Sequence, residues 1–347
     1  MSKHELVDLS QIPPDLKKVS AYLAGKNAFI QGPGGNISYK DENGLLWIKA
    51  SGFLIEDILQ GKGVAVVNQQ EALNRLFEAA DVYPESEYNA RIALSVVPSG
   101  EEGSRPSMET GFHVALGKNV LHCHSVFANI VLCSTTGRQV IENLFSGKPY
   151  PFHFIPYQNP GLNLTNAIKP LSTKEQDVPV VFFLENHGMI VSGENVQEVI
   201  KIHQEVNAVL QEAFGVAEEA LQFSLLPLKG EEEWEAHLPF VHLEEVLHRF
   251  GSQFLFPDQV IFFQKYFLGE AASRLRVDPL QNKIFIKHSR REATTIAEIL
   301  TCFAVIYQYL LQAGLTIKEL SPEDIAFVGN MDMEKYRKQM LEKQSQL

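Results

Sequence analysis

The sequence predicts a mixed α/β protein with a second, smaller α+β unit toward its C-terminal end. Residues 37–40 and 45–49 are strand-like runs on either side of the turn-forming stretch 41–44, a pattern typical of a β-hairpin. Residues 178–184 form a continuous apolar run of the kind that a buried strand has. Helical spacing of apolar residues follows at 194–213, so strands and helices alternate along the chain.

Apolar spacing and turn-forming residues indicate the other elements of the larger unit. We expect helices at 13–27, 71–80, 107–116, 127–133 and 138–144. We expect strands at 64–68, from 119 through 124, around 151–156 and at 189–191. The stretch 97–106 is polar and turn-rich, which predicts a loop before the helix at 107–116.

Residues 226–233 combine proline, glycine and a run of charges, which predicts a domain boundary. We therefore divide the chain into residues 1–225 and 226–347. In the second part the sequence predicts a small α+β extension. Its expected helices lie at 243–250, 292–313 and 333–342, and its expected strands at 260–263 and 283–287.

The composition of the 347 residues excludes several classes of protein. A formal charge of −12 argues against general binding to nucleic acid or to anionic membranes. The three cysteines include no CxxC pair, which argues against a disulfide framework and fits a reducing cytoplasm. The N-terminal residues lack the apolar segment of a secretory signal, and no run approaches the roughly 18 apolar residues of a membrane span. We expect a cytoplasmic protein.

His122 and His124 are the most informative pair in the sequence. In an extended backbone, residues i and i+2 share a face, so both imidazoles would point the same way and Cys123 the other way. Such a pair is how many metal sites begin. His187 is a candidate third ligand, at a point where an apolar strand breaks before Gly188. Its alternative role is a strand-end histidine capped by a carbonyl group.

Glu109 is the candidate acid/base residue, because it lies at the start of the helix that leads into the histidine strand. Its alternative role is an ordinary glutamate in the first turn of a surface helix. His113 follows one helical turn later and is a candidate support for Glu109 or for the metal ligands. A surface histidine is the competing interpretation.

Two small turns, at 34–36 and 50–52, can present backbone N–H groups to an anion. Neither matches a Walker loop or the glycine fingerprint of a dinucleotide site. On their own they would be hairpin turns.

The order of these motifs resembles the class II aldolase/adducin family over residues from about 12 to 220. Pro156, Tyr157 and Gly161 also resemble the segment between the family's metal-binding strands. The segments that carry the resemblance keep one order and compatible spacings: 35–38, 49–52, 106–109 with His113, 122–124 and 186–188.

The resemblance implies a three-layer αβα fold with a mostly antiparallel central sheet. It implies a homo-oligomer, commonly a tetramer with sites at subunit interfaces. One Zn²⁺ per subunit would be held by His122, His124 and His187, and an imidazole-rich site also admits Mn²⁺ or Co²⁺. Glu109 would be the acid/base residue and, in some resting sites, an extra ligand. The implied substrate or phosphate site is lined by Gly35, Asn36, Ser51, Gly52 and Ser107.

The sequence departs from this pattern at Met108, where fuculose-phosphate aldolases have a serine, and this puts the mode of phosphate binding in question. Neither Tyr150 nor Tyr157 aligns with the proton-donating tyrosine of some aldolases. The part from about 226 resembles the longer aldolase domain of bifunctional rhamnulose-phosphate aldolase/alcohol dehydrogenases. Asp258 in this part is a candidate support for the site, with a turn or helix cap as its alternative role.

The function implied is a class II, zinc-dependent aldehyde-lyase. It would cleave a ketose or ketose phosphate by a reversible retro-aldol reaction through a metal-stabilised enediolate. A sugar-phosphate 4-epimerase or a dehydratase uses the same metal ligands with another acid/base partner. A non-catalytic scaffold of the adducin kind is the third possibility, and it predicts that the ligands have been lost. The expected partner is a small sugar or sugar phosphate.

Overall fold

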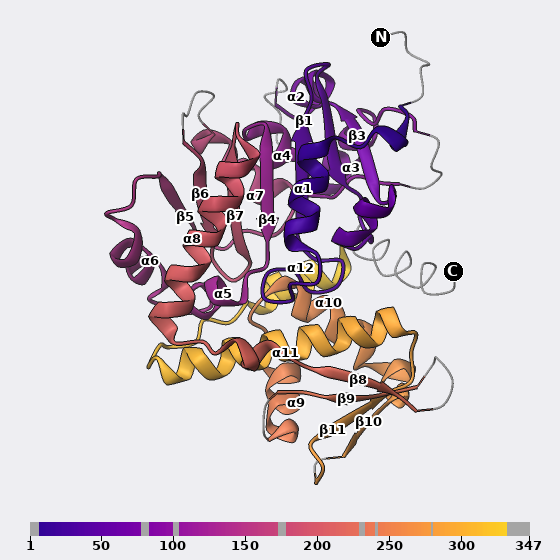
Figure 1. Cartoon of the computed structure of the whole chain (residues 1–347), viewed down its shortest axis with the longest axis vertical. Helices are drawn as coiled ribbons and strands as arrows, with labels where there is room; N and C mark the ends of the chain where they lie inside the picture. The colour runs from indigo at the N-terminus through magenta and orange to yellow at the C-terminus, as the bar shows by residue number, and fades with distance from the viewer. Residues whose placement is uncertain are drawn as a thin grey trace.

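The structure is a computed structural model that describes residues 7–77, 83–99, 104–172, 178–228, 233–239, 242–278 and 280–331. Its larger part is built on a seven-stranded sheet in the order β3-β2-β1-β4-β7-β6-β5 (Figure 1). Neighbouring strands are antiparallel except β5 and β6, which are parallel. The strands are β1 (Asn36–Lys40), β2 (Leu45–Lys49), β3 (Val64–Asn68), β4 (Asn119–Cys123), β5 (Phe152–Ile155), β6 (Val180–Leu184) and β7 (Gly188–Gly193).

Helices cover both faces of this sheet, which confirms the predicted three-layer α/β class. Because side chains alternate along a strand, β4 points Leu121 and Cys123 to one face and Val120 to the other. The first face is covered by α1 (Pro14–Leu23), α5 (Val126–Leu132), α6 (Gly137–Phe145) and α8 (Val196–Phe214). The second face is covered by α2 (Gln69–Phe77), α4 (Thr110–Ala115) and α7 (Leu162–Ile168), and α3 (Glu85–Ala93) packs against α2.

The C-terminal unit contains a separate antiparallel sheet in the order β10-β11-β9-β8. The long apolar helix α11 (Arg290–Gln312) packs against α5 of the larger part and against β9 of the small sheet, and so joins the two (Figure 1). The other elements are β8 (Ser224–Pro227), β9 (Trp234–His237), β10 (Leu275–Asp278), β11 (Lys283–Ile286), α9 (Leu243–Ser252), α10 (Pro257–Tyr266) and α12 (Pro322–Asn330). Short 3₁₀ helices lie at Leu9–Gln11, Ile55–Gln60, Lys169–Leu171, Glu218–Leu221 and Gly269–Arg274.

The strand expected at 260–263 is wrong, because these residues lie inside helix α10. Val260 and Ile261 pack toward α12, whereas Phe262 joins the main core, so the helix is apolar on two sides. A short apolar run of this kind does not distinguish a buried strand from a buried helix. Pro257 in the first turn was the sign of a helix start.

Other boundaries differ less. Helix α4 begins at Thr110 rather than at 107, so Glu109 is its N-cap residue. The division between 225 and 226 falls inside β8, which pairs with β9 of the small sheet, and the two-domain division stays a prediction. The expected helix at 333–342 lies outside the described residues, as do 78–80 of the expected helix at 71–80 and 100–103 of the expected loop.

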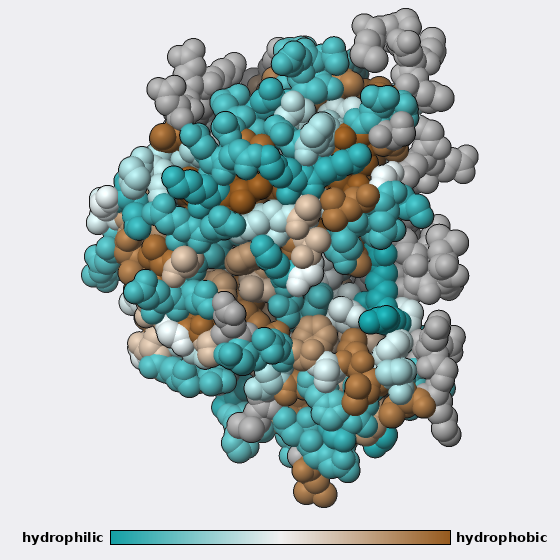
Figure 2. All heavy atoms as spheres, in the orientation of Figure 1, coloured by the Kyte–Doolittle hydropathy of each residue, from teal (hydrophilic) through white to brown (hydrophobic). Residues whose placement is uncertain are grey.

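Among the described residues, α11 is the one helix that is long and apolar enough to cross a membrane by length and composition. Its packing inside the protein accounts for this composition, since 67% of its most apolar window is buried. On the face seen in Figure 2, apolar side chains form scattered patches separated by hydrophilic ones.

Candidate metal centre

Three histidines meet at one end of the central sheet. His122 lies in β4, His124 one residue beyond it, and His187 in the turn between β6 and β7. Strand β4 pairs with β7, with His122 opposite Ile190, and this pairing brings the turn beside the end of β4. One nitrogen atom of each ring lies within 4.8 Å of the others, and all three residues are buried. Cys123 points to the other face, where its Sγ lies 3.1 Å from Nε2 of His203 in α8.

The turn that carries His187 depends on two unusual backbone positions. Asn186 has a φ of 52°, in the left-handed region. Gly188 has a φ of 158°, and a Cβ atom there would lie 2.2 Å from the carbonyl oxygen of Cys123. Only glycine therefore lets the turn approach β4 this closely.

Two of the imidazoles are held by their Nδ1 atoms. Nδ1 of His122 donates to the carbonyl oxygen of Met189 at 3.1 Å, and Nδ1 of His124 donates to Oδ2 of Asp258 at 2.8 Å. Each bond leaves Nε2 with its lone pair. Burial lowers the pKa of His122 to about 4, which keeps this ring neutral at physiological pH. Its Nε2 is buried and has no hydrogen-bond partner among the described residues.

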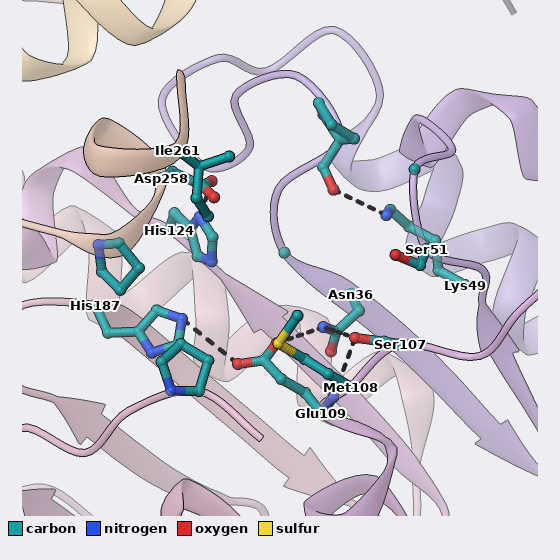
Figure 3. A pocket seen from close by; sticks show the side chains of 15 residues that line it. Asn36, Lys49, Ser51, Ser107, Met108, Glu109, His124, His187, Asp258 and Ile261 are labelled. Carbon is teal, nitrogen blue, oxygen red and sulfur yellow. Dashed lines mark hydrogen bonds and ion pairs between the residues drawn. The ribbon is translucent and has the colours of Figure 1, made fainter. Parts of the chain in front are cut away.

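Glu109 faces the same space from the start of α4. Its Oε2 lies 3.4 Å from Nε2 of His122, and its Oε1 lies 3.5 Å from Nε2 of His187. Figure 3 shows its carboxylate directed toward His187 from across the pocket. Asn36 holds this carboxylate, because Nδ2 of Asn36 donates to Oε2 at 2.6 Å. Glu109 is 6% exposed, so the surface alternative is wrong.

His113 is fully buried and supports Glu109 through Asn36. Nε2 of His113 donates to Oδ1 of Asn36, and Nδ1 of His113 accepts from the Ser38 hydroxyl group at 2.7 Å. The amide of Asn36 fixes these roles, because its Nδ2 already donates to Glu109. Burial holds the pKa of His113 well below its ordinary value, which agrees with a neutral ring in this series of hydrogen bonds. The surface interpretation of His113 is wrong.

The residues assigned to substrate or phosphate line one pocket with Glu109, His124 and His187. These residues are Gly35, Asn36, Ser51, Gly52 and Ser107 (Figure 3). The hydroxyl oxygen of Ser107 accepts from the backbone N–H of Glu109 at 3.2 Å. The sulfur-containing side chain of Met108 also lines the pocket. Among its described lining residues there is neither Tyr150 nor Tyr157.

Lys49 also lines this pocket, a role that its position in the sequence did not predict. It is 2% exposed, and its Nζ donates to the carbonyl oxygen of Pro33 at 3.1 Å. The available signal was a lysine in the apolar strand β2, directly before the turn at 50–52. A buried cation at this end of the pocket, beside Ser51, suits an anionic group.

Asp258 comes from the C-terminal unit and reaches the site. It lies in the first turn of α10, is 3% exposed, and contacts His124 rather than acting only as a helix cap. Pro257 and Ile261 of the same helix line the pocket as well.

The donor set fits a divalent cation. Imidazole nitrogens are ligands for Zn²⁺ and neighbouring transition metals, and three of them leave coordination positions for other groups. Nε2 of His122 is buried and lacks a hydrogen-bond partner in the part of the chain described, as expected for an atom that serves as a ligand.

A sequence model described as "Class II Aldolase and Adducin N-terminal domain" matches residues 15–214. The chain belongs to the class II aldolase and adducin family. Among the residues that line the pocket, Pro257, Asp258 and Ile261 lie outside the matched range. No curated protein sequence matches the chain.

Several solved structures are similar to this member of the class II aldolase and adducin family. One is the N-terminal class II aldolase domain of a protein from Thermoplasma acidophilum, at 20% identity and a TM-score of 0.49, with 61% of this chain and 99% of that one covered. Another is YgbL from Klebsiella pneumoniae, a putative aldolase/epimerase/decarboxylase, at 19% identity and a TM-score of 0.41, with 61% of this chain and 92% of that one covered. A third is L-fuculose 1-phosphate aldolase from Glaciozyma antarctica PI12, at 14% identity and a TM-score of 0.38, with 88% of this chain and 91% of that one covered.

Proposed function

We propose that the protein is a metal-dependent aldehyde-lyase that cleaves a ketose or ketose phosphate by a retro-aldol reaction. The observation that carries the proposal is the position of Glu109. Its carboxylate faces Nε2 of His122 and Nε2 of His187 inside a buried pocket. A base beside a cation site is the arrangement that carbon–carbon cleavage next to a carbonyl group requires.

His122, His124 and His187 would hold the cation, for which Zn²⁺ is the first candidate and Mn²⁺ or Co²⁺ the alternatives. When bound, a divalent cation supplies a Lewis acid for the negative charge that develops on the substrate oxygens. Glu109 would take up the proton of the hydroxyl group that becomes the aldehyde and return it to the carbon atom that loses its bond. Asn36 holds that carboxylate in place from the other side.

The far end of the pocket would bind an anionic substituent such as phosphate. Lys49 supplies a buried positive charge, and Ser51, Gly52 and Ser107 line the wall around it. The protein as a whole carries a charge of −12, so a local cation is needed to hold an anion against the repulsion of the rest of the molecule. We propose that the enzyme acts in the cytoplasm as a homo-oligomer, and size measurement in solution tests the latter.

The first experiment is metal analysis of the purified protein, followed by incubation with a panel of ketose phosphates and free ketoses. We expect one cation per subunit and release of an aldehyde together with dihydroxyacetone or its phosphate. Epimerised or dehydrated sugars without cleavage would instead identify a 4-epimerase or a dehydratase. A protein that binds no stoichiometric metal and converts no sugar would support the adducin-like scaffold.

Replacing the proposed base tests its role directly. We expect Glu109→Gln to lower kcat at least about 100-fold while the metal stays bound, because the amide cannot accept the proton. Metal content and steady-state kinetics are the measurements. The matched control is Glu292→Gln, which changes a buried carboxylate near His288 outside the pocket. Near-normal turnover of Glu109→Gln would remove Glu109 from the mechanism.

A further inference from the structure

The C-terminal unit contacts His124 and the turn before His187, whereas His122 is oriented within the larger part. Nδ1 of His122 donates to Met189 in the neighbouring strand β7. His124 instead donates to Asp258 of α10, across 134 positions of sequence. The turn before His187 is also held from the C-terminal unit. There Nδ2 of Asn186 donates to the carbonyl oxygens of Leu255 at 2.8 Å and Lys318 at 2.7 Å.

We propose that the C-terminal unit is part of the metal site, with Asp258 as a positioning residue that fixes the tautomer and orientation of His124. The carbonyl groups of Leu255 and Lys318, by accepting from Asn186, hold the turn that carries His187 in position. The inference rests on the proposed metal-dependent function and adds to it. Asp258 lies beyond residues 15–214, the part that matches the family.

The contact between Asp258 and His124 has the form that a metal ligand needs. A carboxylate that accepts from Nδ1–H leaves Nε2 as the only nitrogen with a lone pair, and it increases the basicity of that nitrogen. Asp258 is 3% exposed and His124 is 7% exposed, so water competes little for the bond. In Figure 3, Asp258 lies against His124 on the side of the ring away from Glu109.

The glycine-rich loop before β1 leaves space for this contact. A Cβ atom at Gly34 would lie 2.6 Å from Oδ2 of Asp258 and 3.0 Å from Nδ1 of His124. No positive φ is required at this position, so the need for glycine here is one of space. A methyl group at residue 34 should therefore displace the carboxylate from the imidazole, and it would also press on the backbone carbonyl oxygen of Gln31, 2.9 Å from the added carbon.

The left-handed turn offers a second, independent test of the same idea. Asn186 has a φ of 52°, a conformation that glycine adopts without cost. Asn186→Gly therefore keeps the backbone path of the turn but removes both hydrogen bonds to the C-terminal unit. If those bonds position His187, their loss should weaken metal binding.

The measurement is the dissociation constant for Zn²⁺, taken by competition with a chromophoric chelator, on the full-length protein and its variants. We expect Asp258→Ala to weaken zinc binding about 10- to 100-fold, the usual effect of losing a carboxylate behind a ligating histidine. Asp258→Asn should weaken it less, because an amide oxygen still accepts from Nδ1–H. Gly34→Ala and Asn186→Gly should each weaken it while the metal-free proteins stay folded by circular dichroism.

The absorption spectrum of the Co²⁺-loaded protein gives a signature that a general loss of stability does not produce. We expect its visible bands to change in Asp258→Ala and to return toward wild type in Asp258→Asn. The matched control is Glu292→Ala, which removes a buried carboxylate 3.5 Å from Nδ1 of His288 within the same unit. This control should lower the unfolding temperature and leave zinc affinity and the cobalt spectrum unchanged.

Two results would overturn the inference alone: wild-type zinc affinity in Asp258→Ala, or an equal loss of affinity in Glu292→Ala. A wild-type protein that binds no stoichiometric zinc would overturn the proposed function, and this inference with it. Should Asp258→Ala fail to fold, Asp258→Asn decides the role of Asp258 by the same measurement, and Asn186→Gly decides that of the turn.

Discussion

Asn36 uses both ends of its amide group on other side chains of the protein. Its Nδ2 donates to Glu109 and to the hydroxyl oxygen of Ser107, and its Oδ1 accepts from His113. A phosphate bound by Asn36 would have to compete with the Glu109 carboxylate for the same N–H groups. The phosphate role of Asn36 stays a prediction, whereas its link between the buried His113 and the proposed base is a feature of the structure.

Lys49 is the residue for which we expect the clearest dependence on substrate charge. Lys49→Met should raise KM for a phosphorylated ketose about 10- to 100-fold, because a hydrogen bond to a charged group is lost. KM for an unphosphorylated ketose should change little. Steady-state kinetics on both substrates, with metal content measured in parallel, test this.

Lys40 offers a matched control for Lys49. It is also buried in the sheet, but its Nζ donates to the carbonyl oxygens of Val114 and Leu116 at the end of α4, outside the site pocket. Lys40→Met should lower stability and leave both KM values unchanged. An equal rise of KM for the two substrates in Lys49→Met would contradict an anion-binding role.

The histidine group could be predicted from the sequence because its parts are local. His122 and His124 share a face through strand alternation, and Gly188 marks the break that holds His187. For Asp258 the sequence left two roles open, support of the site or a turn or helix cap. No local pattern shows which distant helix packs against the end of a strand. Lys49 was missed because a single lysine in a short strand usually points to solvent.

At the scale of elements, the hairpin of β1 and β2 and the long helix α8 follow their sequence patterns closely. The error at 260–263 arose where local pattern is ambiguous, in a helix buried on two sides. The helices α3, α7 and α12 and the strands β8, β9 and β10 were not predicted. These elements are short, and in proteins tertiary packing rather than intrinsic propensity supplies most of the stability of such helices.

The packing of α11 against the loop before β1 predicts a pH dependence of stability. The backbone N–H of Gly32 donates to Oε2 of Glu298 at 2.7 Å. Burial, with a smaller repulsion from Glu56, raises the pKa of Glu298 from 4.5 to about 7. The folded protein thus binds this proton more tightly than the unfolded chain. The contribution of Glu298 to stability is therefore greatest below pH 4.5 and falls as the pH rises through about 7.

Glu298→Gln should remove this dependence, because glutamine keeps an acceptor for Gly32 and carries no charge. We expect the variant to gain stability over wild type between pH 5 and pH 8, by at most about 1.4 kcal/mol per pH unit, the limit for one proton. Thermal unfolding at several pH values measures the difference. The control is Glu212→Gln, which makes the same change at an exposed position of α8. A constant difference in Glu298→Gln would contradict the assignment.

At the scale of the molecule, the proposed site joins the seven-stranded sheet to the C-terminal unit. A cation bound there would stabilise the native arrangement of both parts, because the unfolded chain does not hold the ligands together. We expect saturating Zn²⁺ to raise the free energy of unfolding by about 4 kcal/mol at 1,000 times its dissociation constant. A chelator should reverse the gain. Thermal unfolding with and without metal measures it, and His187→Ala, which loses a proposed ligand, should show little response.

The distance along the chain between His124 and Asp258 has a consequence for the protein during its synthesis. At about 5–20 residues per second, the 134 positions between them correspond to roughly 7–27 s of translation. Over that interval the ribosome has already delivered His122 and His124, and later the His187 turn, without the helix that contacts His124. The nascent chain therefore presents His124 without its carboxylate partner, and under the proposed function we expect tight metal binding only after α10 has docked.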